Sequence, residues 1–180
     1  SIPPKTQWPQ KNMFAISPIS GYRIVEELQA CEGKILTYWR STTWGNLVVN
    51  GKYNENHFSD ELVKACAEMV NSWKPLVKWV TCIPSLKHTE LVPDFAKRLA
   101  NALDLPFIEC IDKVSQNNPQ KEMNNSYKQV KNLDGVFKIN TTIINSSPCL
   151  LIDDIIDSGW TFTVASVLLR QAGVAGVYPL

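Results

Sequence analysis

The sequence predicts an α/β fold in which a mainly parallel sheet is covered by helices on both faces. Short apolar runs at residues 79–83, 107–111 and 149–152 have the length and composition of buried strands. Helical patterns or long crossovers separate these runs, which indicates β–α–β units and parallel pairing. We expect the three strands to be neighbours in one sheet, with ligand chemistry at their carboxyl ends.

The predicted organisation has three parts. Residues 1–20 are irregular and proline-rich, and we interpret them as an interdomain linker within a longer protein. Residues 21–76 are predicted to form an N-terminal hood, a small α+β subdomain, and residues 77–180 are predicted to form the core. A chain of 180 residues is long enough for one hydrophobic core of ordinary size.

Within the hood, residues 34–38 and 46–49 are predicted to be short strands, and Asn-Gly at residues 50–51 is a turn signal. Ser59 is a suitable N-cap for a helix whose apolar residues recur at helical spacing. Pro75 is expected to end that helix.

The core is predicted to continue with a helix that begins at Pro93. Residues 112–134 are polar and long for a loop, so we expect them to be mobile or functional. A strand at residues 136–139, a helix at residues 161–172 and a last strand at residues 174–178 complete the prediction.

Composition limits the classes of function. The chain is 44% hydrophobic and 19% charged, as in an ordinary globular protein. Its formal net charge of +1 is too small for binding to nucleic acid by bulk electrostatics. No apolar run approaches membrane-spanning length, and residues 1–7 lack the apolar core of a signal peptide. These features predict a cytoplasmic protein with no membrane partner.

The cysteines give no sign of a metal site or a disulfide framework. They are odd in number, far apart in the sequence and without a CxxC pair. Most of them lie in apolar runs, where a free thiol behaves as a small hydrophobic group in a reducing cytosol. The set is Cys31, Cys66, Cys82, Cys110 and Cys149.

The segment with the clearest chemical pattern is CLLIDDIIDSGWT at residues 149–161. Its apolar strand ends at Asp153 and Asp154, whose carboxylates accept hydrogen bonds well from a sugar diol. Gly159 removes a side chain where the backbone must approach a ligand, and free N–H groups at the following helix start suit a phosphate. A phosphate at one end and a diol at the other describe a phosphorylated ribose.

Two other interpretations of this segment stay open. An acidic turn that caps a helix is common in α/β proteins and needs no ligand. An acid pair at a strand end also occurs at the metal site of P-loop ATPases, but the sequence has no GxxxxGK[ST] motif.

Residues 150–161 resemble the signature of type I phosphoribosyltransferases: an apolar strand, two acids, two apolar residues and then D-[ST]-G-x-T. The resemblance implies that Asp153 and Asp154 bind the ribose hydroxyls of phosphoribosyl pyrophosphate and contact its metal indirectly. It also implies a catalytic proton acceptor at Asp157. The phosphate-binding set that it implies is Asp157, Ser158, Gly159, Trp160 and Thr161. Trp160 departs from the family pattern, in which this residue is usually small or basic.

A second stretch is similar to the pyrophosphate loop of the same family. It follows the strand at residues 79–83 and consists of Pro84, Ser85, Leu86 and Lys87. The region at residues 113–137 resembles the flexible loop of ComF-like members of this family. The stretches WVTCIPSLKH, LVPDFAKRLA, PQKEMNNS and DDIIDSGWT together resemble the phosphoribosyltransferase-like carboxy-terminal domain of some bacterial RecQ-type ATP-dependent DNA helicases. This likeness covers about residues 22–180 and implies a helicase domain upstream in the same polypeptide.

The resemblance leaves two functions open. In the first, the domain is an enzyme of nucleotide metabolism, with Mg²⁺ as cofactor and phosphoribosyl pyrophosphate as substrate. In the second, it binds a phosphoribosyl or nucleotide-like ligand without catalysis and regulates or positions a DNA-repair helicase. DNA is then a possible partner. Basic residues that could meet pyrophosphate or DNA phosphates are Lys113, Lys121, Lys128, Lys131 and Lys138.

Overall fold

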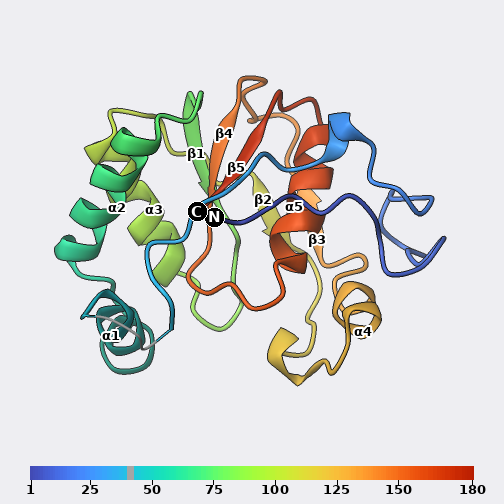
Figure 1. Ribbon diagram of the computed structural model, residues 1–180, viewed down its shortest axis with the longest axis horizontal. Helices are drawn as coiled ribbons and strands as arrows, with labels where there is room; N and C mark the ends of the chain where they lie inside the picture. The colour runs from blue at the N-terminus through green and yellow to red at the C-terminus, as the bar shows by residue number, and fades with distance from the viewer. Residues whose placement is uncertain (40–42) are drawn as a thin grey trace.

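A small parallel sheet lies at the centre of the protein (Figure 1). The computed structural model describes residues 1–39 and 43–180. The sheet contains β1 (Trp79–Cys82), β4 (Cys149–Ile152) and β5 (Val177–Pro179) in the order β1-β4-β5. Both pairings are parallel, as the sequence predicted for β1 and β4. The fold is therefore mixed α/β with a parallel three-stranded sheet.

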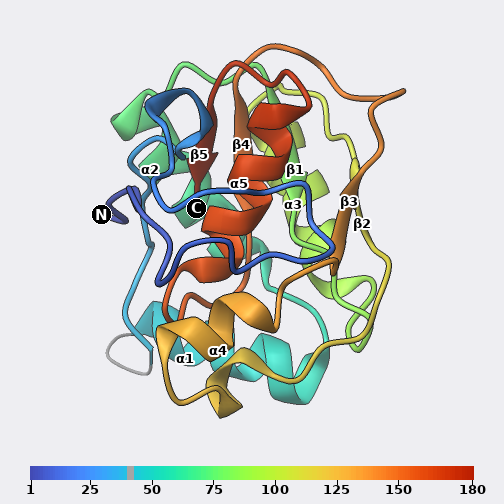
Figure 2. The same cartoon turned by 90° about the vertical axis from the view of Figure 1, so that its right-hand side faces the viewer.

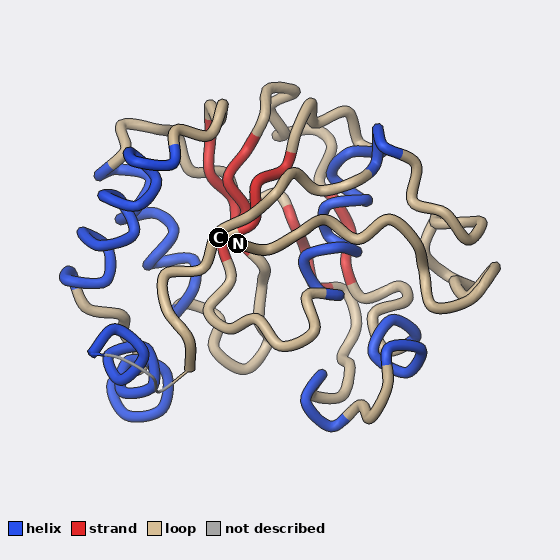
Figure 3. The backbone as a smooth tube through the Cα atoms, in the orientation of Figure 1, coloured by secondary structure: helices blue, strands red, loops and turns tan. Residues whose placement is uncertain are grey.

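Helices cover both faces of this sheet, which explains the continuous apolar runs in its strands. In β4, Leu150 and Ile152 belong to a core cluster with α2 (Asp60–Trp73) and α3 (Leu91–Ala102). Cys149 and Leu151 face the opposite cluster, which contains α5 (Trp160–Gln171). Figure 3 shows the three layers, with α5 on one side of the strands and α2 and α3 on the other.

The helices of the core begin close to their predicted positions. The helix α2 starts directly after Ser59, although the Ser59 side chain makes no capping hydrogen bond. Its last residue is followed by Lys74 in the left-handed conformation, at φ 55°. The helix α3 starts two residues before Pro93, which therefore lies in its first turn, where proline is tolerated. The helix α5 ends before Gly173, which has φ 102°.

A separate two-stranded sheet is formed by β2 (Ile111–Lys113) and β3 (Phe137–Ile139), which pair antiparallel. The predicted strand at residues 107–111 is wrong in its bounds. Phe107 makes only an isolated parallel bridge to Val80, so the chain leaves the central sheet before β2 begins. That bridge places Phe107 next to β1, so the predicted strand meets the central sheet at this bridge alone.

The polar segment predicted as one loop contains short helices. They are η3 (Gln120–Glu122), a 3-10 turn, and α4 (Ser126–Lys131). Asn125 caps α4 by accepting a hydrogen bond from the Lys128 amide at 2.9 Å. Both elements are too short to show a hydrophobic period in the sequence, which is why the sequence did not predict them. The mobility of this segment stays a prediction.

Both strands predicted in the hood are wrong. Residues 46–49 lie in α1 (Thr43–Asn50). The turn expected at residues 50–51 is instead the junction of α1 with η2 (Gly51–Glu55), a π-helical turn. Residues 34–38 form no strand, although the Lys34 amide donates to the carbonyl of Pro179 at 3.0 Å. A short apolar run fits a strand or a packed helix equally well, and packing against α2 and α3 decides for the helix. The other element here is η1 (Glu26–Leu28), a 3-10 turn.

The segment at residues 1–24 is irregular but packs on the core. Figure 2 shows it crossing the outer face of α5. Trp8 is 2% exposed and stacks on Trp160 with ring centroids 6.0 Å apart. The Asp134 carboxylate accepts hydrogen bonds from the amides of residues 15–17, the shortest of them 2.7 Å long. The division of the chain into linker, hood and core stays a prediction.

Within residues 1–39 and 43–180, no helix is long and apolar enough to cross a membrane.

The burial of Trp8 predicts that the N-terminal segment is needed for stability. We expect Trp8→Ala to lower the free energy of unfolding by about 3–5 kcal/mol, the usual cost of removing a buried Trp side chain. Leu76→Ala is the matched control, since Leu76 is 76% exposed. Urea unfolding followed by fluorescence measures both. Equal stability of Trp8→Ala and the wild type would show that this segment is only loosely attached.

Candidate functional site

Two of the segments singled out by the sequence meet at the carboxyl edge of the sheet. Cys82 at the end of β1 is in register with Ile152 at the end of β4. The residues that follow these two strands therefore emerge side by side. They line one cavity of about 970 Å³, which includes residues 84–87 and 153–159 together with Thr161. We call it the lysine cavity, because Lys52, Lys87, Lys113 and Lys121 also line it.

The turn between β4 and α5 exposes the start of that helix. Gly159 immediately precedes α5 with φ 77°, a conformation that residues with a Cβ atom rarely adopt. As N-cap it supplies no side-chain acceptor to the first turn of the helix. The first amide groups of α5 are therefore available to water or to an anion. This is the backbone arrangement that the sequence predicted for a phosphate.

The two adjacent acids have different surroundings. The Asp153 Oδ1 atom accepts a hydrogen bond from the Asp154 amide at 2.8 Å. Burial, followed by the charge of Asp154, raises the pKa of Asp153 well above its ordinary value. Asp154 instead forms an ion pair with Lys52, whose Nζ atom lies 2.7 Å from the Asp154 Oδ2 atom. The two adjacent acids therefore differ: burial disfavours the charged form of Asp153, whereas the Lys52 ammonium compensates the charge of Asp154.

Asp157 is exposed and lines the lysine cavity. Its Oδ2 atom accepts a long hydrogen bond of 3.4 Å from the Gln129 Nε2 atom of α4. This contact ties the turn to the polar segment that follows β2. Its exposed carboxylate can approach a bound molecule from the cavity wall.

Trp160 differs from the other predicted phosphate-binding residues. Ser158, Gly159 and Thr161 line the lysine cavity, whereas the Trp160 side chain is 6% exposed and packs on Trp8. The Lys5 ammonium lies 4.4 Å from the centre of the Trp160 ring, in a cation–π contact. A ligand in the lysine cavity could therefore contact only the backbone amide of Trp160. The Trp160 side chain instead anchors the turn by packing on Trp8.

The lysines of the cavity come from separate parts of the chain. Lys52 lies in η2, Lys87 follows β1, Lys113 ends β2 and Lys121 lies in η3. Burial lowers the pKa of Lys113, an effect that the charge of Asp153 opposes. Four ammonium groups around an acidic turn suit a ligand with several negative charges and a neutral hydroxylated part. Sequence reasoning missed Lys52 and Lys5, since no motif places either residue near the turn.

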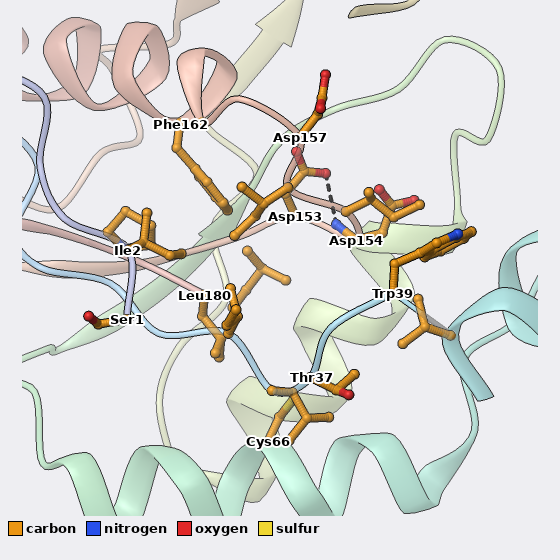
Figure 4. Close-up of a pocket in the computed structure, with 18 of the residues that line it drawn as sticks. Ser1, Ile2, Thr37, Trp39, Cys66, Asp153, Asp154, Asp157, Phe162 and Leu180 are labelled. Atoms are coloured by element: carbon orange, nitrogen blue, oxygen red, sulfur yellow. Dashed lines mark hydrogen bonds between the residues drawn. The ribbon is translucent and has the colours of Figure 1, made fainter. Parts of the chain in front are cut away.

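A second cavity, of about 570 Å³, also borders this turn (Figure 4). Residues 153–159 line both cavities. The second cavity is otherwise largely apolar, and we call it the apolar cavity. In the close-up, Phe162 and Leu180 approach Asp153 from α5 and from the end of the chain. A molecule in the apolar cavity would therefore contact the same turn as a molecule in the lysine cavity.

The acid pair is a possible but incomplete metal site. Across residues 1–39 and 43–180, no three His, Cys, Asp or Glu side chains converge as metal ligands would. Mg²⁺ is usually held by one or two carboxylates together with substrate phosphates. Asp153 and Asp154 fit that donor set, provided that a bound ligand supplies the remaining oxygens.

The raised pKa of Asp153 predicts a pH dependence of stability. The folded protein holds this proton more tightly than the unfolded chain, so the stabilising contribution is largest at low pH. It is lost as the pH rises above about 3.9, the ordinary pKa of aspartate. We expect Asp153→Asn to raise the melting temperature at neutral pH and to flatten its decline between about pH 4 and pH 7.

Asp104→Asn is the matched control, because Asp104 is exposed and its φ of 55° suits asparagine. Differential scanning calorimetry across this pH range measures both variants. A lower melting temperature for Asp153→Asn at neutral pH, with no change in the control, would show that the ionised carboxylate stabilises the fold.

Comparison with known proteins adds no assignment. A scan against protein-family models finds no match, and a search of the curated proteins finds no significant match.

Proposed function

We propose that the chain is a phosphoribosyltransferase-type domain, of type I fold, that binds phosphoribosyl pyrophosphate or a related phosphoribosyl ligand in the lysine cavity. One observation carries the proposal. The segments that resemble the family's ribose 5-phosphate and pyrophosphate loops, which are separated by 66 positions between Lys87 and Asp153, line a single cavity at the carboxyl edge of the sheet. In open α/β sheets, ligands bind at this edge.

The chemistry of the cavity supports one orientation of the ligand. The 5′-phosphate would accept hydrogen bonds from the amides at the start of α5 and from the hydroxyls of Ser158 and Thr161. The ribose hydroxyls would donate to Asp153 and Asp154. The pyrophosphate would then lie toward residues 84–87, where the lysines of the cavity provide positive charge. When bound, Mg²⁺ would neutralise part of the pyrophosphate charge and so favour its departure.

Catalysis would use the position of Asp157 at the wall shared by both cavities. A nitrogen nucleophile in the apolar cavity would attack the ribose C1 atom as the bond from C1 to the pyrophosphate oxygen breaks. Pyrophosphate leaves with the bonding electrons, and the proton of the nucleophile passes to the Asp157 carboxylate. The apolar cavity favours a flat, weakly polar acceptor over a charged one.

The second candidate function is a non-catalytic module that senses a phosphoribosyl or nucleotide-like ligand and regulates a RecQ-type helicase. The burial of Trp160 favours it, because Lys5 and Trp8 tie the phosphate turn to the N-terminal segment. Ligand binding at the turn would then alter the attachment of that segment. DNA contact through Lys121, Lys128 and Lys131 is the form of this hypothesis that involves a nucleic acid.

Calorimetric titration with phosphoribosyl pyrophosphate and Mg²⁺, compared with ribose 5-phosphate, tests the proposal. We expect both to bind, and Asp153→Asn combined with Asp154→Asn to weaken both by removing the acceptors of the ribose hydroxyls. Absence of binding at millimolar ligand would refute both the catalytic and the sensing function. Pyrophosphate release with an acceptor would separate the first function from the second.

Thr161→Val tests the phosphate contact alone. We expect it to cost about 1–3 kcal/mol of binding free energy for ribose 5-phosphate, since it removes a donor to a charged acceptor. Thr141→Val is the control, because Thr141 is exposed in the connection between β3 and β4. Equal affinities for Thr161→Val and Thr141→Val would place the phosphate elsewhere.

A further inference from the structure

Among the residues that the structure describes, Lys52 is the one lysine of the cavity that forms an ion pair with the acidic turn. Its side chain is 19% exposed and that of its partner Asp154 is 12% exposed. Such a pair is partly removed from water, so the loss of one partner leaves the other charge poorly compensated. The contact joins the N-terminal part of the chain to the turn after β4.

The backbone around Lys52 is held in an uncommon conformation. Lys52 lies in the π-helical turn η2, and such turns occur often at functional sites. A Cβ atom on Gly51 would lie 2.7 Å from the Phe58 ring and 2.8 Å from the His57 carbonyl, so only glycine fits this packing. The side-chain Nδ2 atom of Asn50 donates a hydrogen bond to the Glu55 Oε1 atom at 2.6 Å across the same turn. Packing and hydrogen bonding thus fix the direction in which Lys52 leaves the helix.

A phosphoribosyl ligand changes the partners of this ion pair. If the ribose hydroxyls donate to Asp154, they compete with Lys52 for the same oxygen atoms. When a ribose hydroxyl displaces Lys52 from Asp154, the Lys52 ammonium loses its anionic partner. The hydroxyl is neutral and cannot take that place, so the ammonium requires another anion. In the orientation proposed above, the uncompensated charge next to the ribose is the diphosphate on C1.

We propose that Lys52 binds the diphosphate of the ligand and makes the site selective for phosphoribosyl diphosphate over ribose 5-phosphate; this inference rests on the proposed function. In the free protein Lys52 holds Asp154. In the complex the ammonium moves to the diphosphate oxygens, and Asp154 becomes available to the ribose. Lys52 is therefore a binding residue for one of the two ligands and a competitor of the other.

The opposite effects on two ligands give a sharp test. We expect Lys52→Met to lower the affinity for phosphoribosyl pyrophosphate at least tenfold. The affinity for ribose 5-phosphate should stay equal or rise, because Asp154 is no longer occupied. Isothermal titration calorimetry of both ligands, with Mg²⁺ and without it, measures this ratio. Lys52→Arg should restore most of the selectivity, since it restores a cation.

Two further variants guard against a purely structural effect. Lys64→Met changes an exposed lysine of α2 and should alter neither affinity. Lys52→Gln keeps a polar side chain and replaces Lys52→Met if the latter does not fold, with the same expected ratio.

Each other result would overturn the inference. An equal loss for both ligands would mean that the ion pair only supports the turn. No loss for either ligand would mean that Lys52 does not meet the diphosphate. If the wild-type protein binds neither ligand, the proposed function fails first, and the inference fails with it.

Discussion

The parallel register of β1 and β4 is the constraint on which the site depends. Because Cys82 and Ile152 are partners, the chain leaves both strands at the same edge, and residues 84–87 face the acidic turn. The strands hold this register because each is buried on both faces, by α5 on one side and by α2 and α3 on the other. A slip of one residue would exchange the two sets of buried side chains. The apolar core therefore fixes the polar site.

Two kinds of interaction hold the acidic turn in place: apolar packing of Trp160 and the ion pair of Asp154 with Lys52. Trp160 is packed on Trp8, so the first turn of α5 is tied to a segment more than a hundred residues away in the sequence. On the side of the lysine cavity, partial burial raises the pKa of Asp153, and Lys52 compensates the charge of Asp154. A buried carboxyl is costly unless something compensates it, and such groups concentrate at functional sites.

The core of the fold and the acidic turn could be predicted because their signals are local. The apolar residues of β4 and the glycine at residue 159 each show their structural role within a few positions. The strand predicted at residues 46–49 failed because a short apolar run has no period of its own, and tertiary packing made it a helix. Lys52 could not be found for a related reason: its contact with Asp154 joins two segments that are distant in the sequence and meet only in the folded chain. Sequence locates the acids, and only the fold locates the lysine beside them.

Backbone amide resonances in solution test the central claim, that the acidic turn binds a phosphorylated ribose, most directly. The measurement is a titration of ¹⁵N-labelled protein with ribose 5-phosphate, followed by two-dimensional NMR. We expect saturable shifts concentrated at Ser158, Gly159 and Thr161, with smaller shifts at residues 84–87. Shifts confined to the exposed lysines of residues 121–131, or no saturable shift at the start of α5, would contradict it.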